Sequence, residues 1–170
     1  MRIEEVPSGS RVAIDANILI YHFTGVSPES SNFLRRCESG ELTGFVSTSI
    51  LAEMLHRLMI LEALDTKVVS GGNPVRRLRE TPQRVCALTR YLEAEEALLR
   101  VGLTFMEVNL ETFGLARQVR RQHGLLINDS LLVGTMLQFG LNLLATADHD
   151  FERLAVLTPC YPGDLPKAAA

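Results

Sequence analysis

The sequence RVAIDANILIYHF, residues 11–23, places one carboxylate directly after a short apolar run. The run Val-Ala-Ile at 12–14 has the length and composition of a buried strand, and a helical turn begins near Asn17. Asp15 stands between the two. An acid at the end of a buried strand loses hydration without improving the packing of the core. Because parallel sheets bind their ligands at the carboxyl ends of their strands, Asp15 is the first candidate site residue.

Length and composition indicate one globular domain. A chain of 170 residues is long enough for a hydrophobic core, and its 46% hydrophobic and 22% charged residues are ordinary for such a domain. We expect the domain to span residues 1–160 and a C-terminal tail to follow at 161–170, with 167–170 frayed. The three cysteines are widely spaced and odd in number, so they fit neither a disulfide framework nor a zinc site.

The sequence also predicts a cytoplasmic protein that makes no membrane contact. The first ten residues, MRIEEVPSGS, carry acids and a proline where a signal peptide requires an apolar segment. The longest apolar-rich stretch, residues 131–147, is interrupted by Gln138, Gly140 and Asn142, and is therefore unsuited to a membrane span.

The net charge of −3 does not indicate a general nucleic-acid-binding protein. The arginines are unevenly distributed, however, with one group formed by Arg76, Arg77, Arg79, Arg84 and Arg90 and a second by Arg117, Arg120 and Arg121. A local basic surface is compatible with a mildly negative protein. The same arginines are equally compatible with ordinary solvated helix faces.

Strand and helix signals alternate along the chain. We expect strands at residues 11–14, 43–48, 103–108 and 142–146, with a short fifth strand at 155–157. We expect helices at 28–38, 49–65, 82–99, 110–122 and 130–139, and a helical excursion at about 65–102 that stands off the sheet. The alternation predicts an α/β fold, a three-layer α/β/α sandwich around a central parallel sheet of four to five strands.

Four acids fall at the junctions of these elements. Asp15 ends the first strand, Glu53 lies in the first turns of the helix after the second strand, and Asp148 follows the fourth strand. These positions share one edge of a parallel sheet, and Asp129 joins them if the helix that it opens begins at that edge. Asp129 and Asp148 are also compatible with a structural role as helix N-caps, whereas Glu53 lacks a capping-box partner.

A group of four carboxylates predicts a bound cation. Two carboxylates about 4 Å apart repel each other by about 4 kcal/mol at an effective dielectric constant near 20, so four require a compensating charge. Ligands that are all oxygen suit Mg²⁺ or Mn²⁺ better than zinc, and such ions commonly act on phosphates. The sequence lacks a P-loop, a G-x-S-x-G elbow and a G-x-G-x-x-G turn.

Three stretches together resemble the PIN-domain nucleases, most closely the VapC-type toxins of toxin–antitoxin pairs. They are AIDANILIY at 13–21, STSILAEMLHRL at 47–58 and INDSLLVGTMLQFGLNLLATADHDF at 127–151. The resemblance covers roughly residues 11–157. It implies a PIN-like fold and a metal-dependent endoribonuclease that holds Mg²⁺ or Mn²⁺ with Asp15, Glu53, Asp129 and Asp148.

The resemblance also implies roles for neighbouring residues and partners. Asn17 matches a polar position that orients the first acid or the metal-bound water, and Thr146 is expected to act similarly. The implied partners are an RNA substrate, a small antitoxin protein and a second copy of the chain in a homodimer. Two departures concern the excursion at 65–102, which is longer than in the most compact toxins, and Asn128, an unexpected neighbour of Asp129.

Several alternatives stay open at this level. Asp150 is either a further ligand or an N-cap, and we favour the cap; His149, between two acids, is more simply a surface residue than a ligand. A phosphohydrolase with an aspartate nucleophile usually carries a second Asp two residues after the first, where this chain has Asn17. A PIN-like binding or assembly module without activity is the other alternative, which metal titration would distinguish.

Overall fold

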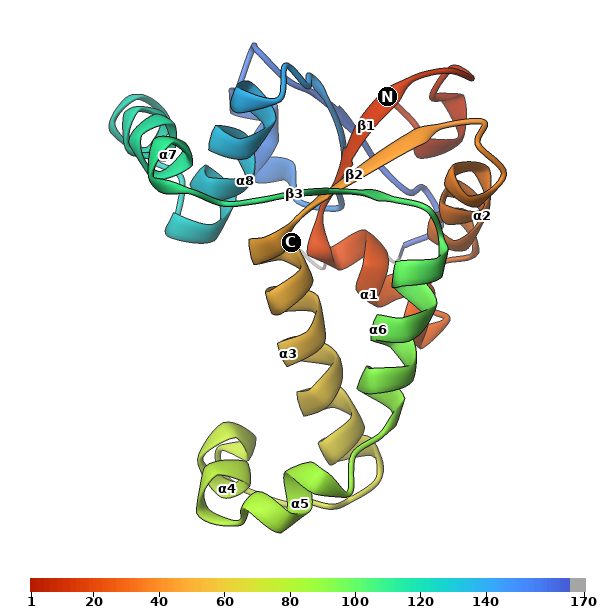
Figure 1. Ribbon diagram of the computed structural model, residues 1–170, viewed down its shortest axis with the longest axis vertical. Coiled ribbons are helices and arrows are strands. Elements are labelled where there is room, and N and C mark those ends of the chain that lie inside the picture. Colours follow the sequence, from red (N-terminus) through yellow and green to blue (C-terminus); the bar gives the residue numbers. More distant parts are fainter. Residues whose placement is uncertain (166–170) are drawn as a thin grey trace.

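The computed structural model describes residues 1–165, which fold around a parallel sheet of five strands in the order β3-β2-β1-β4-β5 (Figure 1). The strands are β1 (Arg11–Ile14), β2 (Thr43–Ser47), β3 (Thr104–Met106), β4 (Leu143–Ala145) and β5 (Thr158–Cys160). β1 lies at the centre, where Val12 pairs with Gly44 of β2 and Leu143 of β4. Its apolar residues at 12–14 are fully buried, as the sequence predicted.

Helices cover both faces of the sheet, so the predicted three-layer sandwich is confirmed. The connection from β1 to β2 contains α1 (Ala16–Thr24) and α2 (Pro28–Glu38), and that from β2 to β3 contains α3 (Thr48–Asp65) and α6 (Arg90–Arg100). The return from β3 to β4 contains α7 (Leu110–His123) and α8 (Ile127–Gln138). Because parallel crossovers are right-handed, the return lies on the opposite face, and Figure 1 shows α7 and α8 across the sheet from α2.

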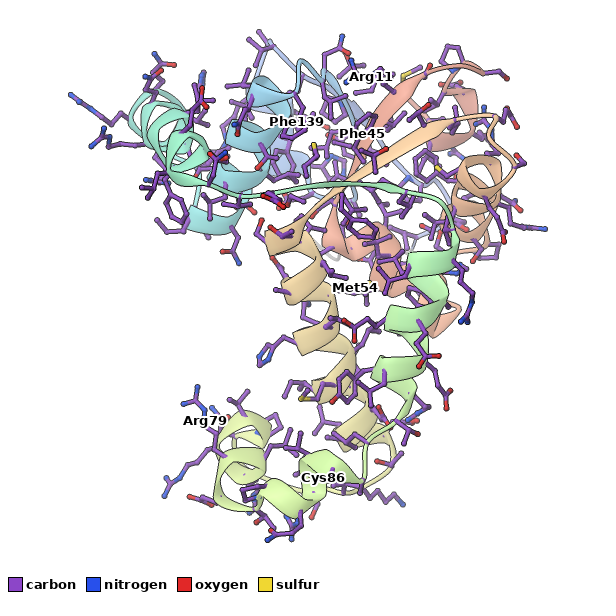
Figure 2. The ribbon with its side chains drawn as sticks, in the orientation of Figure 1. Arg11, Phe45, Met54, Arg79, Cys86 and Phe139 are labelled. Carbon is purple, nitrogen blue, oxygen red and sulfur yellow. The ribbon has the colours of Figure 1, made fainter. Side chains whose placement is uncertain are left out.

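One end of the sheet is closed by side chains from distant segments. The Arg11 guanidinium lies 5.0 Å from the centre of the Phe45 ring and donates a 3.1 Å hydrogen bond to the carbonyl of Phe139 (Figure 2). Arg11 begins β1, so this contact marks the amino edge of the sheet. The carboxyl edge, where Asp15 stands, lies at the other end of the strand.

A helical arm extends from the sheet. α3 runs away from it, α4 (Pro74–Glu80) and α5 (Pro82–Cys86) lie at the far end, and α6 returns (Figure 1). The expected single helix at 82–99 is wrong, because a break separates α5 from α6. The buried carboxylate of Glu62 accepts hydrogen bonds from the backbone N–H groups of Thr89, Arg90 and Tyr91 at 2.8–3.1 Å, and thereby fixes a new helix start.

β3 and β4 are shorter than the expected 103–108 and 142–146, and two other boundaries differ by three residues. The fifth strand is Thr158–Cys160 rather than 155–157, because Leu157 turns back to bond the carbonyl of Leu154 and pairing with β4 begins only at Thr158. The edge position of β5 also tolerates its proline, which cannot donate to a further strand. α8 begins at Ile127 rather than at residue 130.

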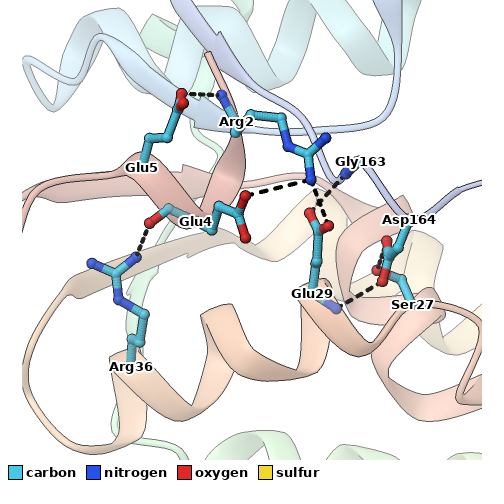
Figure 3. Close-up of polar contacts among 8 residues, drawn as sticks. All are labelled: Arg2, Glu4, Glu5, Ser27, Glu29, Arg36, Gly163 and Asp164. Carbon is cyan, nitrogen blue, oxygen red and sulfur yellow. Dashed lines mark hydrogen bonds and ion pairs between the residues drawn. The ribbon is translucent and has the colours of Figure 1, made fainter.

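The two ends of the described chain meet beside α2 (Figure 3). The Glu29 carboxylate receives hydrogen bonds from the Arg2 guanidinium and from the backbone N–H of Gly163, both at 2.7 Å. The Asp164 carboxylate accepts from the Ser27 hydroxyl at 2.7 Å and from the Glu29 N–H at 2.8 Å. Residues 161–164 of the expected tail are therefore anchored, and the expectation for 167–170 falls outside the described residues. Within residues 1–165, no helix is both long and apolar enough to cross a membrane.

Candidate active site at the carboxyl edge of the sheet

Asp15 is held rigidly at the end of β1. Its backbone N–H donates to the carbonyl of Ala145 at 2.9 Å, which continues the pairing with β4. Its side chain caps α1, because Oδ1 accepts the Ala16 N–H at 2.7 Å. Oδ2 accepts from the Asn17 amide and from the Thr146 hydroxyl, both at 2.7 Å. Three donors therefore fix the orientation of this carboxylate.

Asn17 and Thr146 bind the ends of β1 and β4 together. The Asn17 Oδ1 accepts the N–H of Ala147 at 3.0 Å while its amide nitrogen donates to Asp15. The Thr146 hydroxyl, which is fully buried, accepts the N–H of Asp148 at 3.0 Å while it donates to Asp15. Both residues thus contact the first candidate acid, as the resemblance implied.

Asp148 lies directly after β4 and also serves as a helix cap. Its Oδ1 accepts the N–H of Asp150 at 2.8 Å at the start of a 3₁₀ helix, η2 (His149–Arg153). The cap that we favoured for Asp150 is wrong: its carboxylate instead pairs with Arg153 at 2.9 Å. An N-cap at Asp150 would require η2 to begin at residue 151, whereas it begins at His149.

Glu53 reaches the site from the second turn of α3. Its carboxylate accepts a 3.2 Å hydrogen bond from the Asn128 amide and lies 3.6 Å from the Arg57 guanidinium. Asn128, noted in the sequence only as an unexpected neighbour of Asp129, therefore links α3 to the first turn of α8. A distance of 75 residues separates the partners, and no local pattern reveals such a contact.

Asp129 lies within the first turn of α8 and is not its N-cap, which is Leu126. The structural alternative of a cap for Asp129 is thus wrong. Burial raises the pKa of the Asp129 carboxyl, and the negative charges of Asp148, Glu53 and Asp150 raise it further. Carboxylates from α3, α8 and the start of η2 therefore lie close enough to oppose one another's ionisation.

Among the four candidate acids, Asp15 has the most strongly raised pKa. Burial raises its pKa from the ordinary value of 3.8 to about 6, although the hydrogen bonds from Thr146 and the Ala16 N–H lower it. The charges of Glu53 and Asp129 also raise it. A buried carboxyl with nearby acids is typical of functional sites, and a cation would relieve the repulsion.

The four acids lie near one another, but their side chains are not arranged in a metal-binding geometry. Among residues 1–165, no three Asp, Glu, His or Cys side chains stand in positions that could hold a metal ion. His149 is also engaged elsewhere, since its ring pairs with Glu152 at 2.7 Å and stacks on Tyr161. A cleft of about 600 Å³ lies away from these acids, between α1, α3 and α6, and is lined partly by Phe23, Leu58 and Tyr91.

Comparison with known proteins identifies the family. The PIN domain family model matches residues 12–157, which is most of the chain. The chain belongs to the PIN domain family. Ribonuclease VapC2 of Methanocaldococcus jannaschii is 24% identical over 148 residues, covering 87% of this chain and 91% of the relative. Ribonuclease VapC6 of the same organism is 24% identical over 151 residues, covering 86% and 94%.

Solved structures share the fold of this PIN domain. The VapBC2 complex of Rickettsia felis bound to a promoter DNA fragment superimposes with a TM-score of 0.59 at 16% identity, covering 89% of this chain and 98% of the other. VapC20 of Mycobacterium tuberculosis, a Sarcin-Ricin loop cleaving toxin, gives 0.57 at 14% identity, covering 85% and 95%. At these identities the likeness concerns the fold, so the activity must be argued from the site.

Proposed function

We propose that this PIN domain is an endoribonuclease that hydrolyses RNA phosphodiester bonds with Mg²⁺ or Mn²⁺, and that it is the toxin of a toxin–antitoxin pair. The observation that carries the proposal is Asp15, a half-buried carboxyl with a raised pKa, fixed by three hydrogen-bond donors and close to the negative charges of Glu53 and Asp129. The ribonuclease names of the curated relatives and the toxin–antitoxin complexes among the structural relatives support it.

The donor set fits a hard divalent ion. Asp15, Glu53, Asp129 and Asp148 offer only oxygen atoms. Burial is the main cause of the raised pKa values of Asp15 and Asp129, and the charges of the neighbouring acids raise them further. These four acids would hold the metal, which supplies Lewis acidity toward the phosphate and activates water for hydrolysis. Asn17 and Thr146 orient Asp15, so that its carboxylate is presented without reorganisation.

The same contacts argue against a phosphohydrolase with an aspartate nucleophile. In that mechanism the second position is an acid, whereas Asn17 here uses its amide nitrogen on Asp15 and its amide oxygen on the Ala147 N–H. Both of its polar atoms are therefore occupied in holding the loop. Asn17 consequently has no free group to serve as a proton donor to a leaving group.

We also propose the partners and the compartment that this function requires. A small antitoxin and a location in the cytoplasm follow from the toxin role. A homodimer is supported by apolar side chains that α7 and α8 leave in solvent, among them Leu110, Phe113 and Leu137, which are 90%, 47% and 41% exposed. Molar mass from light scattering tests the dimer, and co-purification with the product of an adjacent small gene tests the antitoxin.

The test of the activity is cleavage of a labelled RNA by the purified protein. We expect cleavage with Mg²⁺ or Mn²⁺, none in excess EDTA, and a loss of about 10³-fold or more in Asp15→Asn, since a ligand of the metal is removed. Glu38→Gln, which changes an exposed acid on α2, should cleave as the wild type does. Full activity in EDTA, or in Asp15→Asn, would contradict the proposal. Absence of Mn²⁺ binding by calorimetry would favour a binding module.

A further inference from the structure

The far end of the helical arm carries a concentrated positive charge. Residues 66–90, which we call the basic tip, contain six basic side chains (Lys67, Arg76, Arg77, Arg79, Arg84 and Arg90) and one acid, Glu80. The tip therefore has a charge of +5, and because the whole chain has −3, the remainder has −8. Four of the six cations lie on the two short helices α4 and α5, so the positive charge is concentrated at the end of the arm.

Four of these six cations, Lys67 among them, have no acidic partner within the described part of the chain. Arg76 pairs with Glu80 at 2.8 Å, and Arg90 pairs with Asp65 at 2.7 Å. Within the described part of the chain, the exposed side chains of Arg77, Arg79 and Arg84 form no ion pair. Their charge is thus available to an external anion.

The tip is a folded unit and presents these arginines in fixed places. A small apolar core of Ala63, Val69, Leu78 and Leu88, separate from the main core, packs α4 against the end of α3. The Asn73 side chain caps α4 by accepting the N–H of Arg76 at 3.1 Å. Arginines on two anchored helices lose less conformational freedom on binding than arginines on a loose loop.

The arm connects the tip to the candidate active site. α3 carries Glu53 near its start and Asp65 at its end, twelve residues later, a distance of about 18 Å at 1.5 Å per residue. In the view of Figure 2, Arg79 lies on the side of α3 where α7 and α8 also lie. A nucleic-acid strand with about 3.4 Å per stacked nucleotide would need about five or six nucleotides to cover this distance.

We propose that the basic tip binds the phosphate backbone of the RNA substrate some five or six nucleotides from the cleaved bond. This inference rests on the proposed function. Four carboxylates exceed the charge of one divalent ion, and the chain outside the tip is negative, so phosphates beyond the cleaved bond gain from a basic attachment elsewhere on the protein. Guanidinium groups suit phosphate oxygens well.

The composition of the tip also indicates which part of the RNA it contacts. Residues 66–90 contain no aromatic side chain on which a base could stack. Contacts to phosphate position a nucleic acid without selecting its sequence. The tip therefore adds affinity and register for RNA of sufficient length, while the choice of the cleaved bond belongs to the acidic site.

The test compares two double variants with matched loss of charge, both in an Asp15→Asn background so that the probe survives. The first is Arg79→Gln/Arg84→Gln in the tip, and the control is Arg35→Gln/Arg100→Gln on α2 and α6. The probe is a fluorescent single-stranded RNA of about 30 nucleotides with mixed sequence, and binding is followed by anisotropy at several salt concentrations. Circular dichroism verifies that each variant is folded.

Two lost phosphate contacts should reduce the slope of log K against log[salt] by about 1.4 and weaken binding by about 25-fold near 0.1 M salt. The control should bind as the parent does, and Arg79→Lys/Arg84→Lys should restore much of the affinity. An unchanged slope and affinity in the tip variant would overturn the proposal. So would a tip variant that loses binding only to poly-L-glutamate, which would assign the tip to an acidic protein partner.

Cleavage by the active protein separates this inference from the proposed function. An RNA of about four nucleotides is too short to reach both places at about 3.4 Å per nucleotide, so the tip substitutions should leave its kcat/KM unchanged. The long RNA should lose kcat/KM through KM. If the wild type cleaves neither RNA, the proposed function fails, and the anisotropy experiment still decides whether the tip binds a phosphate backbone.

Discussion

Thr146→Val tests whether the buried contact between β4 and Asp15 supports metal binding. Valine has nearly the shape of threonine, so the substitution removes the hydroxyl without opening a cavity. Three hydrogen bonds are lost: the 2.7 Å bond to Asp15 Oδ2, the 3.0 Å bond from the Asp148 N–H, and a longer 3.4 Å bond from the Asn17 amide. The Asp148 N–H loses its acceptor, which costs about 1–3 kcal/mol of stability.

The effect on the metal should exceed the effect on the fold. The Thr146 hydroxyl lowers the pKa of Asp15, so its removal raises that pKa further above about 6 and lets protons compete with the metal. Loss of a hydrogen bond to a ligating carboxylate typically costs about 10- to 100-fold in metal affinity or activity. We therefore expect Mn²⁺ to bind Thr146→Val about 10- to 100-fold more weakly in calorimetric titrations near neutral pH.

A matched control exists in α8. Thr135 is also fully buried, but its hydroxyl donates to the carbonyl of Leu131 within the same helix and contacts none of the four acids. Thr135→Val should bind Mn²⁺ as the wild type does, and Thr146→Ser, which keeps the hydroxyl, should retain most of the affinity. If Thr146→Val binds Mn²⁺ within about twofold of the wild type, the hydrogen bond does not support the metal site.

Three further substitutions test the energetics of the fold and the site. Asp15 has a pKa of about 6 in the folded protein against an ordinary 3.8, so ionised Asp15 lowers the free energy of unfolding increasingly between these pH values, by up to about 3 kcal/mol above them. Asp15→Asn should therefore raise the melting temperature of the metal-free protein near pH 7.5. A lower melting temperature would contradict this. Burial opposes ionisation of Glu62, yet three backbone N–H bonds lower its pKa, so its stabilisation is present above pH 4.5 and is lost as the pH falls through the lower folded pKa. Glu62→Ala should lower the free energy of unfolding by about 2 kcal/mol, or the melting temperature by about 4–8 °C, and should lose this dependence of stability on acidic pH. If the stability of the variant falls in acid as that of the wild type does, Glu62 is not the cause. Gly134→Ala would place a Cβ 2.9 Å from backbone atoms of α7, and this overlap should lower the free energy of unfolding in urea by about 1–3 kcal/mol despite a helix-propensity gain of about 1 kcal/mol. Gly114→Ala in α7 is the control, because its Cβ meets no atom within 4 Å and the substitution should keep the propensity gain.

The sequence sufficed for features that depend on local chemistry. The strand at 11–14 has the predicted bounds, and Ser27 with Pro28 begins α2 as its capping pattern indicated. The position of Asp15 at the carboxyl edge followed from the parallel topology alone. Asn73-Pro74 carries the same type of signal for α4, so that helix was also accessible to prediction.

Features that depend on distant partners were not accessible. Glu62 starts α6 from 27 residues away, and its apolar neighbours in α3 gave no reason to expect a carboxylate there to act as a cap. The contact between Asn128 and Glu53 joins helices that approach only in the folded chain. Choosing between Asp148 and Asp150 as the cap of η2 required knowing where β4 ends, since both residue types suit the position equally.

The long separation between Asp15 and Thr146 has a consequence for synthesis on the ribosome. The two residues are 131 positions apart, and the helix start at Ser27 is completed by Asp164, 137 positions later. At about 5–20 residues per second, the growing chain waits about 7–26 s between producing Asp15 and producing its partner on β4. Throughout that interval the central strand lacks its neighbour β4. A message interrupted before residue 143 therefore yields a fragment that is both inert at this site and dependent on chaperones or proteases.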